Sequence, residues 1–339
     1  MTTPEPGRPT LVSQPWVPRR VFISGASGFM GRVLAARYQE LGSEVRGVDK
    51  VADVAHGVVA GNTAVAGAWQ AHAQGCDLFL HTAAIVSFTH DPRNFWEVNV
   101  LGTRHALDAA MRGGAERFVH ISSVVAYSFD FPPDVEERYP VRCNGVPYVD
   151  AKVMGEQVVL QAHAAGEIDC TIIRPGDVYG PRSRPWTTRP VRLIQAGSLI
   201  LPLQGKGIFS PVYIDNLIDG ILLAARTPAA AGQVFNLTDG IGIENRTFFG
   251  YYARLLKKDI PMVRENFTSL LAAKALLADR LRKKLGTESQ WNETGVRYLC
   301  RRGTYDIEKA RTLLGFEPQV DLDEGMRRTE EWLRKEGFI

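Results

Sequence analysis

A glycine-rich turn between a strand and a helix constrains the fold of this chain more than any other feature of its sequence. Residues 24–31 read SGASGFMG, after a short β-branched stretch and before a segment with helical spacing of apolar residues. In this setting Gly25 permits a tight turn, Gly28 lets a ligand approach the backbone, and Gly31 lets the helix pack closely on the strand. The helix N-terminus would attract an anion, so the turn predicts a site for the pyrophosphate of a dinucleotide.

A carboxylate follows the next expected strand. Residues 44–48 form a second apolar stretch, and Asp49 comes directly after it. A carboxylate there can accept hydrogen bonds from both hydroxyls of a ribose, and its charge repels the 2′-phosphate of NADP. The sequence therefore favours NAD, although Arg46 and Lys50 lie close enough in the chain to weaken that repulsion.

The alternation of strand and helix continues along the chain. Strand-like stretches are expected at residues 21–24, 44–48, 78–81, 118–122 and 170–174, and helix-like stretches near 94–112 and 149–165. This pattern is typical of an α/β fold with a doubly wound parallel sheet, which binds ligands at the carboxyl ends of its strands. We expect a flexible N-terminal tail over residues 1–18 and a Rossmann-type NAD-binding domain over 19–180. A smaller substrate-binding subdomain is expected over 181–339, with some segments returning to the Rossmann core.

Composition argues against several classes of function. The 339 residues carry 40 Lys and Arg against 37 Asp and Glu, without a block of like charge, so a nucleic-acid partner is not expected. The four cysteines form no CxxC pair, and His81 and His90 have no second ligand at helical spacing, so we expect no metal site. Neither a secretory leader nor a span of ~20 apolar residues is visible, so we expect a cytoplasmic protein.

One amphipathic segment leaves contact with a membrane surface open. Residues 267–285 place five apolar side chains on one helical face, namely Phe267, Leu270, Leu271, Leu277 and Leu281. The simpler interpretation is a helix whose apolar face packs on the core. The alternative is a peripheral contact with lipid.

Two pairs of tyrosine and lysine have the spacing of an acid–base pair. Tyr148 and Lys152 lie four residues apart, hence on one face of a helix, where the ammonium would lower the pKa of the phenol from ~10. Tyr148 is therefore a candidate general acid or base. Tyr305 and Lys309 have the same spacing, but only Tyr148 follows a strand that ends in two serines beside the expected nucleotide site. This context favours Tyr148.

Taken in order, these motifs resemble those of the extended short-chain dehydrogenases/reductases of the NAD-dependent epimerase/dehydratase superfamily. The resemblance is carried by GASGFMG at 25–31, HTAA at 81–84, NVLGT at 99–103, ISS at 121–123, the YxxxK pair and RPGDVYGP at 174–181. It covers nearly everything from residue 20 onward. The run at 174–181 is most similar to the 3β-hydroxysteroid dehydrogenase and sterol or flavonol reductase branches, because it lacks the asparagine with which sugar-nucleotide enzymes commonly hold a diphosphate.

The resemblance implies roles for particular residues. Ser123 would bind the substrate oxygen, with Ser122 as second choice, and Lys152 would bind the nicotinamide ribose. Asn99 would either anchor a proton relay or cap local backbone. Asn62 stands where related chains often carry an aspartate that meets the adenine. NAD would be held by Gly25, Ser27, Gly28, Phe29, Met30, Gly31, Asp49, Asn62, Thr82, Ala83, Ala84, Ser122, Tyr148, Lys152, Pro175 and Gly176.

Three functions are compatible with this resemblance. The first is NAD-dependent interconversion of a secondary alcohol and a ketone on a hydrophobic, steroid-like substrate, by a protein that we expect to be a homodimer. The second is epimerisation or dehydration of a nucleotide sugar, whose diphosphate could be held by Arg182, Arg184, Arg189 and Arg192. The third, NAD sensing without catalysis, is disfavoured because both Ser123 and Tyr148 are present. We expect the first, since apolar residues are predicted at the mouth of the site: Ile85, Val86, Phe88, Trp96, Val178 and Trp186.

Overall fold

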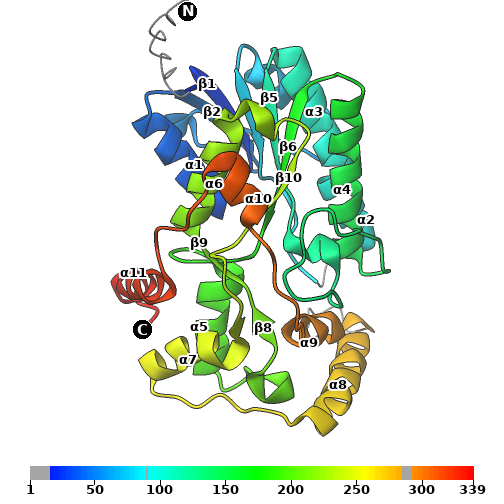
Figure 1. Ribbon diagram of the computed structural model, residues 1–339, viewed down its shortest axis with the longest axis vertical. Helices are drawn as coiled ribbons and strands as arrows, with labels where there is room; N and C mark the ends of the chain where they lie inside the picture. The colour runs from blue at the N-terminus through cyan, green and yellow to red at the C-terminus, as the bar shows by residue number, and fades with distance from the viewer. Residues whose placement is uncertain (1–15, 89–90, 285–291) are drawn as a thin grey trace, which may run out of the picture.

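A parallel sheet of seven strands forms the centre of the molecule (Figure 1), in a computed structural model that describes residues 16–88, 91–284 and 292–339. Most of the predicted tail and His90 lie outside the described residues. The strands lie in the order β3, β2, β1, β4, β5, β6, β10. Their bounds are β1 Arg20–Ser24, β2 Glu44–Asp49, β3 Val58–Ala60, β4 Leu78–His81, β5 Arg117–Ile121, β6 Asp169–Pro175 and β10 Val234–Leu237.

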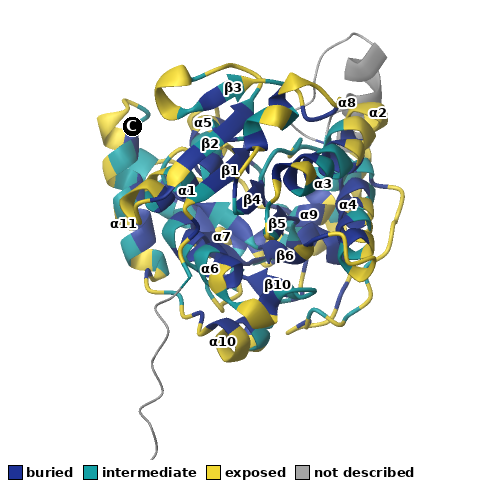
Figure 2. Ribbon diagram, turned by 90° about the horizontal axis from the view of Figure 1, so that it is seen from above, coloured by how far each residue is buried: buried dark blue, intermediate teal, exposed yellow. Residues whose placement is uncertain are grey.

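Apolar side chains cover both faces of this sheet, as its continuous apolar runs predict for parallel strands. On one face Phe22, Phe79 and Phe118 follow one another across β1, β4 and β5, with ring centroids 4.8 and 5.3 Å apart. On the other face Ile23 and Leu80 are fully buried in the larger core cluster. Figure 2 shows the strands buried beneath more exposed helices.

Helices enclose the sheet from both sides, which confirms the predicted doubly wound α/β fold. One side carries α1 Phe29–Glu40, α6 Ile214–Arg226 and α10 Glu308–Leu314. The other carries α3 Gly102–Gly113 and α4 Pro147–Ala164. The strand order reverses between β1 and β4, and doubly wound sheets bind their ligands at that reversal, beyond the carboxyl ends of the strands.

The later part of the chain forms a smaller region at the carboxyl edge of the sheet (Figure 1). Its elements are β7 Asp177–Tyr179 with β9 Pro211–Tyr213, β8 Ile208–Phe209 with β11 Ile243–Glu244, and the helices α5 Arg189–Gln195, α7 Asn245–Leu256, α8 Glu265–Lys284, α9 Glu293–Leu299 and α11 Leu322–Lys335. Earlier in the chain, α2 Pro92–Phe95 leads into a π-helix over Trp96–Leu101. Short helical turns occupy Val54–His56, Ala68–Ala73, Val124–Tyr127, Arg184–Thr188, Pro202–Gly205 and Pro228–Ala230.

Helix α8 corrects one expectation. The predicted helix is present, but Phe267 and Leu270 at its start are 57% and 51% exposed, so this part of its apolar face does not pack on the core. Thr268, Leu271 and Ala272 are less exposed, and Thr268 accepts a hydrogen bond from the backbone of Leu203 at 3.2 Å. The side chains of Leu277 and Leu281 lie outside the described residues. No helix in the described part of the chain is long and apolar enough to cross a membrane.

Candidate active site

The glycine turn joins the ends of three strands. Gly25 has a left-handed φ of +72° and donates from its N–H to the carbonyl of Val48 on β2 at 2.8 Å. A Cβ on Gly25 would lie 2.9 Å from Ala83 N and from Thr82 Oγ1, in the loop after β4. Only glycine therefore allows the loops after β1 and β4 to come this close.

The start of α1 fits an anionic group. Gly28 is the exposed N-cap of α1, and a Cβ there would contact only Gly25 O within 4 Å, so the outer side is open to a ligand. The first turn contains no acidic residue and no side chain caps it, so its first N–H groups have no partner within the helix or from a capping side chain. The side chains of Phe29 and Met30 pack on the core. Gly31 allows the close packing behind, since its Cβ would lie 2.2 Å from Gly25 O.

Asp49 ends β2 beside this turn. Its carboxylate accepts hydrogen bonds from Ser27 N at 2.9 Å and from Lys50 N at 2.7 Å. The site expected for a ribose therefore joins the site expected for the pyrophosphate, and together they fit a dinucleotide. Asn62, in the loop after β3, is exposed, and its Oδ1 accepts from Ala64 N at 3.1 Å.

The loop after β4 closes the other side of the site. Thr82 donates from Oγ1 to Ser24 O at 2.7 Å, which places Ala83 and Ala84 beside the glycine turn. His81 hydrogen-bonds through its two ring nitrogens with Ser24 Oγ and Thr103 Oγ1, at 2.7 and 3.1 Å. Burial, with a smaller effect of Lys152, lowers the pKa of His81 to about 3, so the ring is a neutral structural group.

Asn99 lies on the π-helix and clamps the same loop. Its Oδ1 accepts from Ile85 N at 2.8 Å and its Nδ2 donates to Ile85 O at 3.0 Å, so both ends of the amide hold backbone. Its carbonyl accepts from Thr103 Oγ1 at 2.9 Å. Of the two roles expected for Asn99, this geometry supports the structural one.

Tyr148 and Ser123 meet at the carboxyl edge of the sheet. Tyr148 and Lys152 are both buried on α4, one turn apart, and Ser123 follows β5. The side chain of Ser123 interacts with the phenol of Tyr148 and lowers its pKa. Lys152 donates from Nζ to Ile121 O, the last carbonyl of β5, at 2.8 Å. The structure thus brings the predicted serine, tyrosine and lysine together beside the nucleotide site.

Burial shifts both ionisable groups of this site toward their neutral forms. It raises the pKa of Tyr148 well above 10, and the hydrogen bond from Ser123 opposes only part of this rise. This is opposite to the lowered pKa expected from Lys152, because burial dominates and the group that opposes it is Ser123 rather than the ammonium. Burial also lowers the pKa of Lys152 to about 8, although the nearby Glu156 acts in the other direction.

A buried polar network supports the end of β5 from behind. Ser122 donates from Oγ to Glu156 at 2.5 Å, so its hydroxyl faces α4. Arg174 on β6 makes two hydrogen bonds with the same carboxylate, at 2.9 and 2.6 Å, and a third with Tyr127 Oη at 2.7 Å. Glu156 is fully buried and Arg174 is 3% exposed. This network ties α4 to the strand that carries Ser123.

Aromatic rings surround Tyr148. Phe88 and Phe95 approach its ring at centroid distances of 5.7 and 5.9 Å. Phe88 also contacts Tyr298 of α9 at 5.5 Å, and Tyr298 stacks on Trp186 at 5.6 Å. Rings from both parts of the molecule therefore form one cluster at the proton-transfer residue.

The predicted apolar residues divide into three groups. Ile85, Phe88 and Trp186 belong to the cluster that contains Tyr148. Val178 packs instead against the main core, and Val86 and Trp96 are 60% and 46% exposed.

Tyr298 was not predicted from the sequence, because α9 lies far along the chain and carries no motif that points to Tyr148.

Asp177 lies two residues after the end of β6, next to Gly176, and it is fully buried. Its carboxylate accepts from Arg301 Nη2 at 2.9 Å, from Ser210 N at 3.0 Å and from the hydroxyl of Tyr298. The guanidinium of Arg301 also lies 3.5 Å from the centroid of the Tyr298 ring. The buried carboxylate of Asp177 is thus paired with the guanidinium of Arg301 and with the hydroxyl of Tyr298.

Tyr305, the second tyrosine with a lysine four residues later, lies elsewhere. It precedes α10 rather than lying on it, so the two residues do not share a helix face. Its hydroxyl accepts from Arg301 Nη1 at 3.1 Å, and its ring stacks on Phe131 at 5.0 Å. These contacts give Tyr305 a structural role, as its sequence context predicts.

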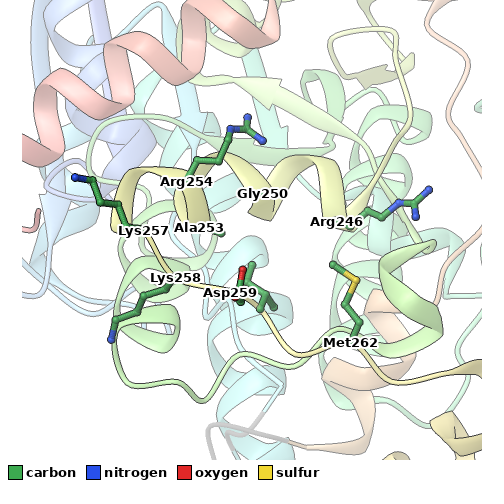
Figure 3. A pocket seen from close by; sticks show the side chains of 9 residues that line it. Arg246, Gly250, Ala253, Arg254, Lys257, Lys258, Asp259 and Met262 are labelled. Carbon is green, nitrogen blue, oxygen red and sulfur yellow. The ribbon is translucent and has the colours of Figure 1, made fainter.

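A cavity of about 580 Å³ lies away from these residues, around α7 and the segment that follows it (Figure 3). Basic and apolar side chains line it, including Arg246, Arg254, Lys257 and Met262. We place the chemistry at Tyr148 rather than here, because an acid–base pair and a dinucleotide cradle meet at Tyr148.

Comparisons with known proteins agree with this geometry. The family model of the NAD dependent epimerase/dehydratase family matches residues 21–238, which include all of the parallel sheet except its first residue, Arg20. A 3-beta-hydroxysteroid dehydrogenase of Mycolicibacterium neoaurum is 30% identical, over 91% of this chain and 89% of its own length. A UDP-glucose 4-epimerase of Mycolicibacterium smegmatis is 29% identical, over 93% and 98%.

Solved structures share the fold. MoeE5 in complex with UDP-glucose and NAD superposes with a TM-score of 0.75 at 21% identity, covering 94% of this chain and 99% of its own. Sequence motifs, the dinucleotide cradle and the family match lead to one conclusion. This chain belongs to the NAD dependent epimerase/dehydratase family, and NAD is its cofactor.

Proposed function

We propose that this protein is an oxidoreductase that interconverts a secondary alcohol and a ketone on a hydrophobic, steroid-like substrate. The observation that carries the proposal is the aromatic enclosure of Tyr148 by Phe88, Phe95 and, through Phe88, Tyr298. Binding at such a site is stabilised by burial of apolar surface of the substrate, at roughly 25 cal/mol per Å². It offers few partners to the many hydroxyls of a sugar.

The residues of the site suit this reaction. NAD, when bound, supplies the acceptor or the donor of the hydride. In reduction, Tyr148 would donate the proton of its Oη to the carbonyl oxygen, and burial keeps the phenol in this protonated form near neutral pH. In oxidation, Tyr148 would first have to lose that proton, because only its phenolate can accept the proton of the substrate hydroxyl. Ser123 would donate a hydrogen bond to the substrate oxygen and stabilise its developing charge.

The remaining polar residues hold the site in place. Lys152 would bind the nicotinamide ribose with the ammonium that now contacts Ile121 O. Pro175 and Gly176 would lie against the nicotinamide, and a Cβ on Gly176 would lie 2.5 Å from Ser210 O, so this turn has no room for a side chain. We propose that Ser122 acts through its backbone, because its hydroxyl is bound to Glu156.

The alternative is an epimerase or dehydratase of nucleotide sugars. Arg182 and Arg184 are exposed in the loop after β7, where they could meet a diphosphate, and a UDP-glucose 4-epimerase is among the relatives. Against it, the position at which such enzymes commonly carry the diphosphate-binding asparagine holds Asp177, whose carboxylate is paired with Arg301.

A panel of substrates followed at the nicotinamide absorbance decides between the two. The panel contains 3β-hydroxysteroids, aryl ketones and UDP-sugars, each with NAD and with NADP. We expect turnover of a steroid or aryl substrate with NAD. Epimerisation of a UDP-sugar, without any redox turnover of the apolar compounds, would replace the proposal by its alternative.

A further inference from the structure

The hydroxyl of Tyr298 is bound to a buried ion pair in the interior of the region after β6. Asp177, Arg301 and Tyr298 are 0%, 3% and 7% exposed, and they bind one another through two side-chain hydrogen bonds and a cation–π contact. The carboxylate has a further donor in Ser210 N. Because the hydroxyl of Tyr298 is bound to Asp177, the rest of its surface is an apolar ring.

That ring is tied to both reacting partners. Through Asp177, Tyr298 is anchored one residue from Gly176, where we place the nicotinamide. Through Phe88, at 5.5 Å, it is joined to the ring of Tyr148. A substrate whose reacting carbon lies between Tyr148 and the nicotinamide would therefore extend toward Tyr298.

Three neighbouring rings pack around Tyr298 and form a continuous aromatic surface with it. Trp186 lies nearly parallel to Tyr298, at 5.6 Å and 23°, and Phe129 meets Tyr298 edge-on at 6.0 Å. Phe88 and Trp186 are only partly buried, so they are the members that a ligand can reach. Stacked and edge-on rings of this kind favour a flat, polycyclic or aromatic partner over a flexible chain.

We propose that Tyr298, locked in place by Asp177 and Arg301, is a positioning residue that holds Phe88 and Trp186 as a ring surface selective for substrates with a planar ring system next to the reacting carbon. This inference rests on the proposed function and extends it, because it makes a residue of α9, outside the sequence motifs, the support of the surface that recognises the substrate body. Phe88 and Trp186 make the contact with the substrate, and the buried ring of Tyr298 holds them from behind.

Binding measurements test the proposal independently of turnover. The NAD-loaded protein is titrated with a planar 3-oxosteroid and with a small acyclic ketone, and binding is followed by quenching of intrinsic fluorescence or by calorimetry. Tyr298→Leu should weaken binding of the 3-oxosteroid by roughly 3- to 10-fold, the size of an aromatic pair contact. Binding of the acyclic ketone should change little. Tyr298→Phe, which keeps the ring, should bind the steroid nearly as the wild type does.

Tyr305→Phe is the matched control. Tyr305 also binds Arg301, but its ring contacts Phe131 and Tyr127 instead of the cluster around Tyr148. This variant should leave steroid binding unchanged. Thermal unfolding and NAD affinity of all variants show whether the fold is retained.

Three results would overturn the inference: no steroid binding by the wild type, equal weakening for steroid and acyclic ketone, or a loss in Tyr305→Phe as large as in Tyr298→Leu. The proposed function can fail separately. In that case the steroid binds and depends on Tyr298, but no hydride transfer to or from it is seen.

Discussion

Tyr148 and Tyr305 have the same sequence spacing to a lysine but different structural environments. Both have a lysine four positions later, yet one lies on α4 beside Ser123 and the other precedes α10 in a structural cluster. Tyr148→Phe should lower kcat at least ~10²-fold, because it removes the proton donor, and should leave NAD affinity nearly intact. Steady-state kinetics and NAD titration check this.

Tyr305→Phe serves as the comparison. Its hydroxyl accepts a hydrogen bond from Arg301 and has no interaction with Ser123 among the described contacts, so kcat should be almost unchanged. Similar losses of kcat in the two variants would mean that the acid–base residue has been misplaced.

Asp49 carries the prediction on cofactor choice. Asp49→Ala removes a negative charge and the acceptor of the Ser27 N–H, so the ratio of kcat/KM with NAD to kcat/KM with NADP should fall. Asp53 is a suitable control, because it is another carboxylate just after β2 but is engaged with His56. If Asp53→Ala lowered the ratio equally, the loss of a negative charge anywhere near β2 would explain the effect, and Asp49 would not be the residue that binds the ribose.

At the residue scale, the positions of the site residues that belong to local motifs could be predicted from the sequence. Gly25, Gly31, Ser123, Tyr148 and Lys152 belong to segments whose backbone is set by neighbouring residues. Their meeting at one sheet edge follows from the direction of parallel strands. The pKa of Tyr148 could not be predicted, because burial depends on rings contributed by distant segments.

Among the elements, α4 and β6 are joined by an ion pair in the interior. Glu156→Gln would leave the guanidinium of Arg174 buried without its charged partner, and we expect a loss of about 3–5 kcal/mol in the free energy of unfolding. Urea unfolding measures the change.

Two comparisons make this prediction specific. Glu330→Gln removes an exposed pair with Arg334 on α11 and should have no measurable effect on stability. Replacing both buried partners, as Glu156→Leu with Arg174→Met, should restore much of the stability lost by Glu156→Gln. A stable single variant would show that water or another group can compensate Arg174.

The elements that the sequence missed are short or irregular. The helix-like stretch expected near 94–112 is helical from residue 92 to 113, but its middle, Trp96–Leu101, is a π-helix that no periodic pattern of apolar residues indicates. Asn99 in this π-helix binds the backbone of Ile85. Strands β7, β8, β9 and β11 have two or three residues each, too few for a periodic pattern to appear.

For the molecule as a whole, Asp239 predicts a dependence of stability on pH. Burial raises its pKa to about 7, against ~3.9 in an unfolded chain. Between these values the folded state retains a proton that the unfolded state has lost, so stability contributed by this group is full below pH ~4 and falls as pH rises to about 7.

Asp239→Asn isolates this contribution. The neutral amide cannot ionise, so the difference in free energy of unfolding between variant and wild type should increasingly favour the variant from pH 5 to pH 7 and then level off. Urea unfolding at several pH values gives this difference. A difference that is independent of pH would show that Asp239 does not titrate in this range.

The assembly of the substrate region lay beyond prediction from sequence. The alternation of strands and helices indicates the parallel sheet, but it does not indicate that α9 brings Tyr298 to Phe88, beside Tyr148, or that Trp186 stacks on Tyr298. Such contacts depend on the packing of segments that carry no shared pattern. For this reason the family and the cofactor follow from the motifs, while the choice of substrate rests on the three-dimensional arrangement.

Strand β10 has a consequence for how the protein is made. It pairs with β6, which ends at Pro175, although β10 itself starts only at Val234. During synthesis β6 therefore leaves the ribosome as an open edge, with unpaired N–H and C=O groups that invite pairing with another chain. Until Leu237 has emerged this edge stays open, and a chaperone that covers it would protect the nascent protein from aggregation.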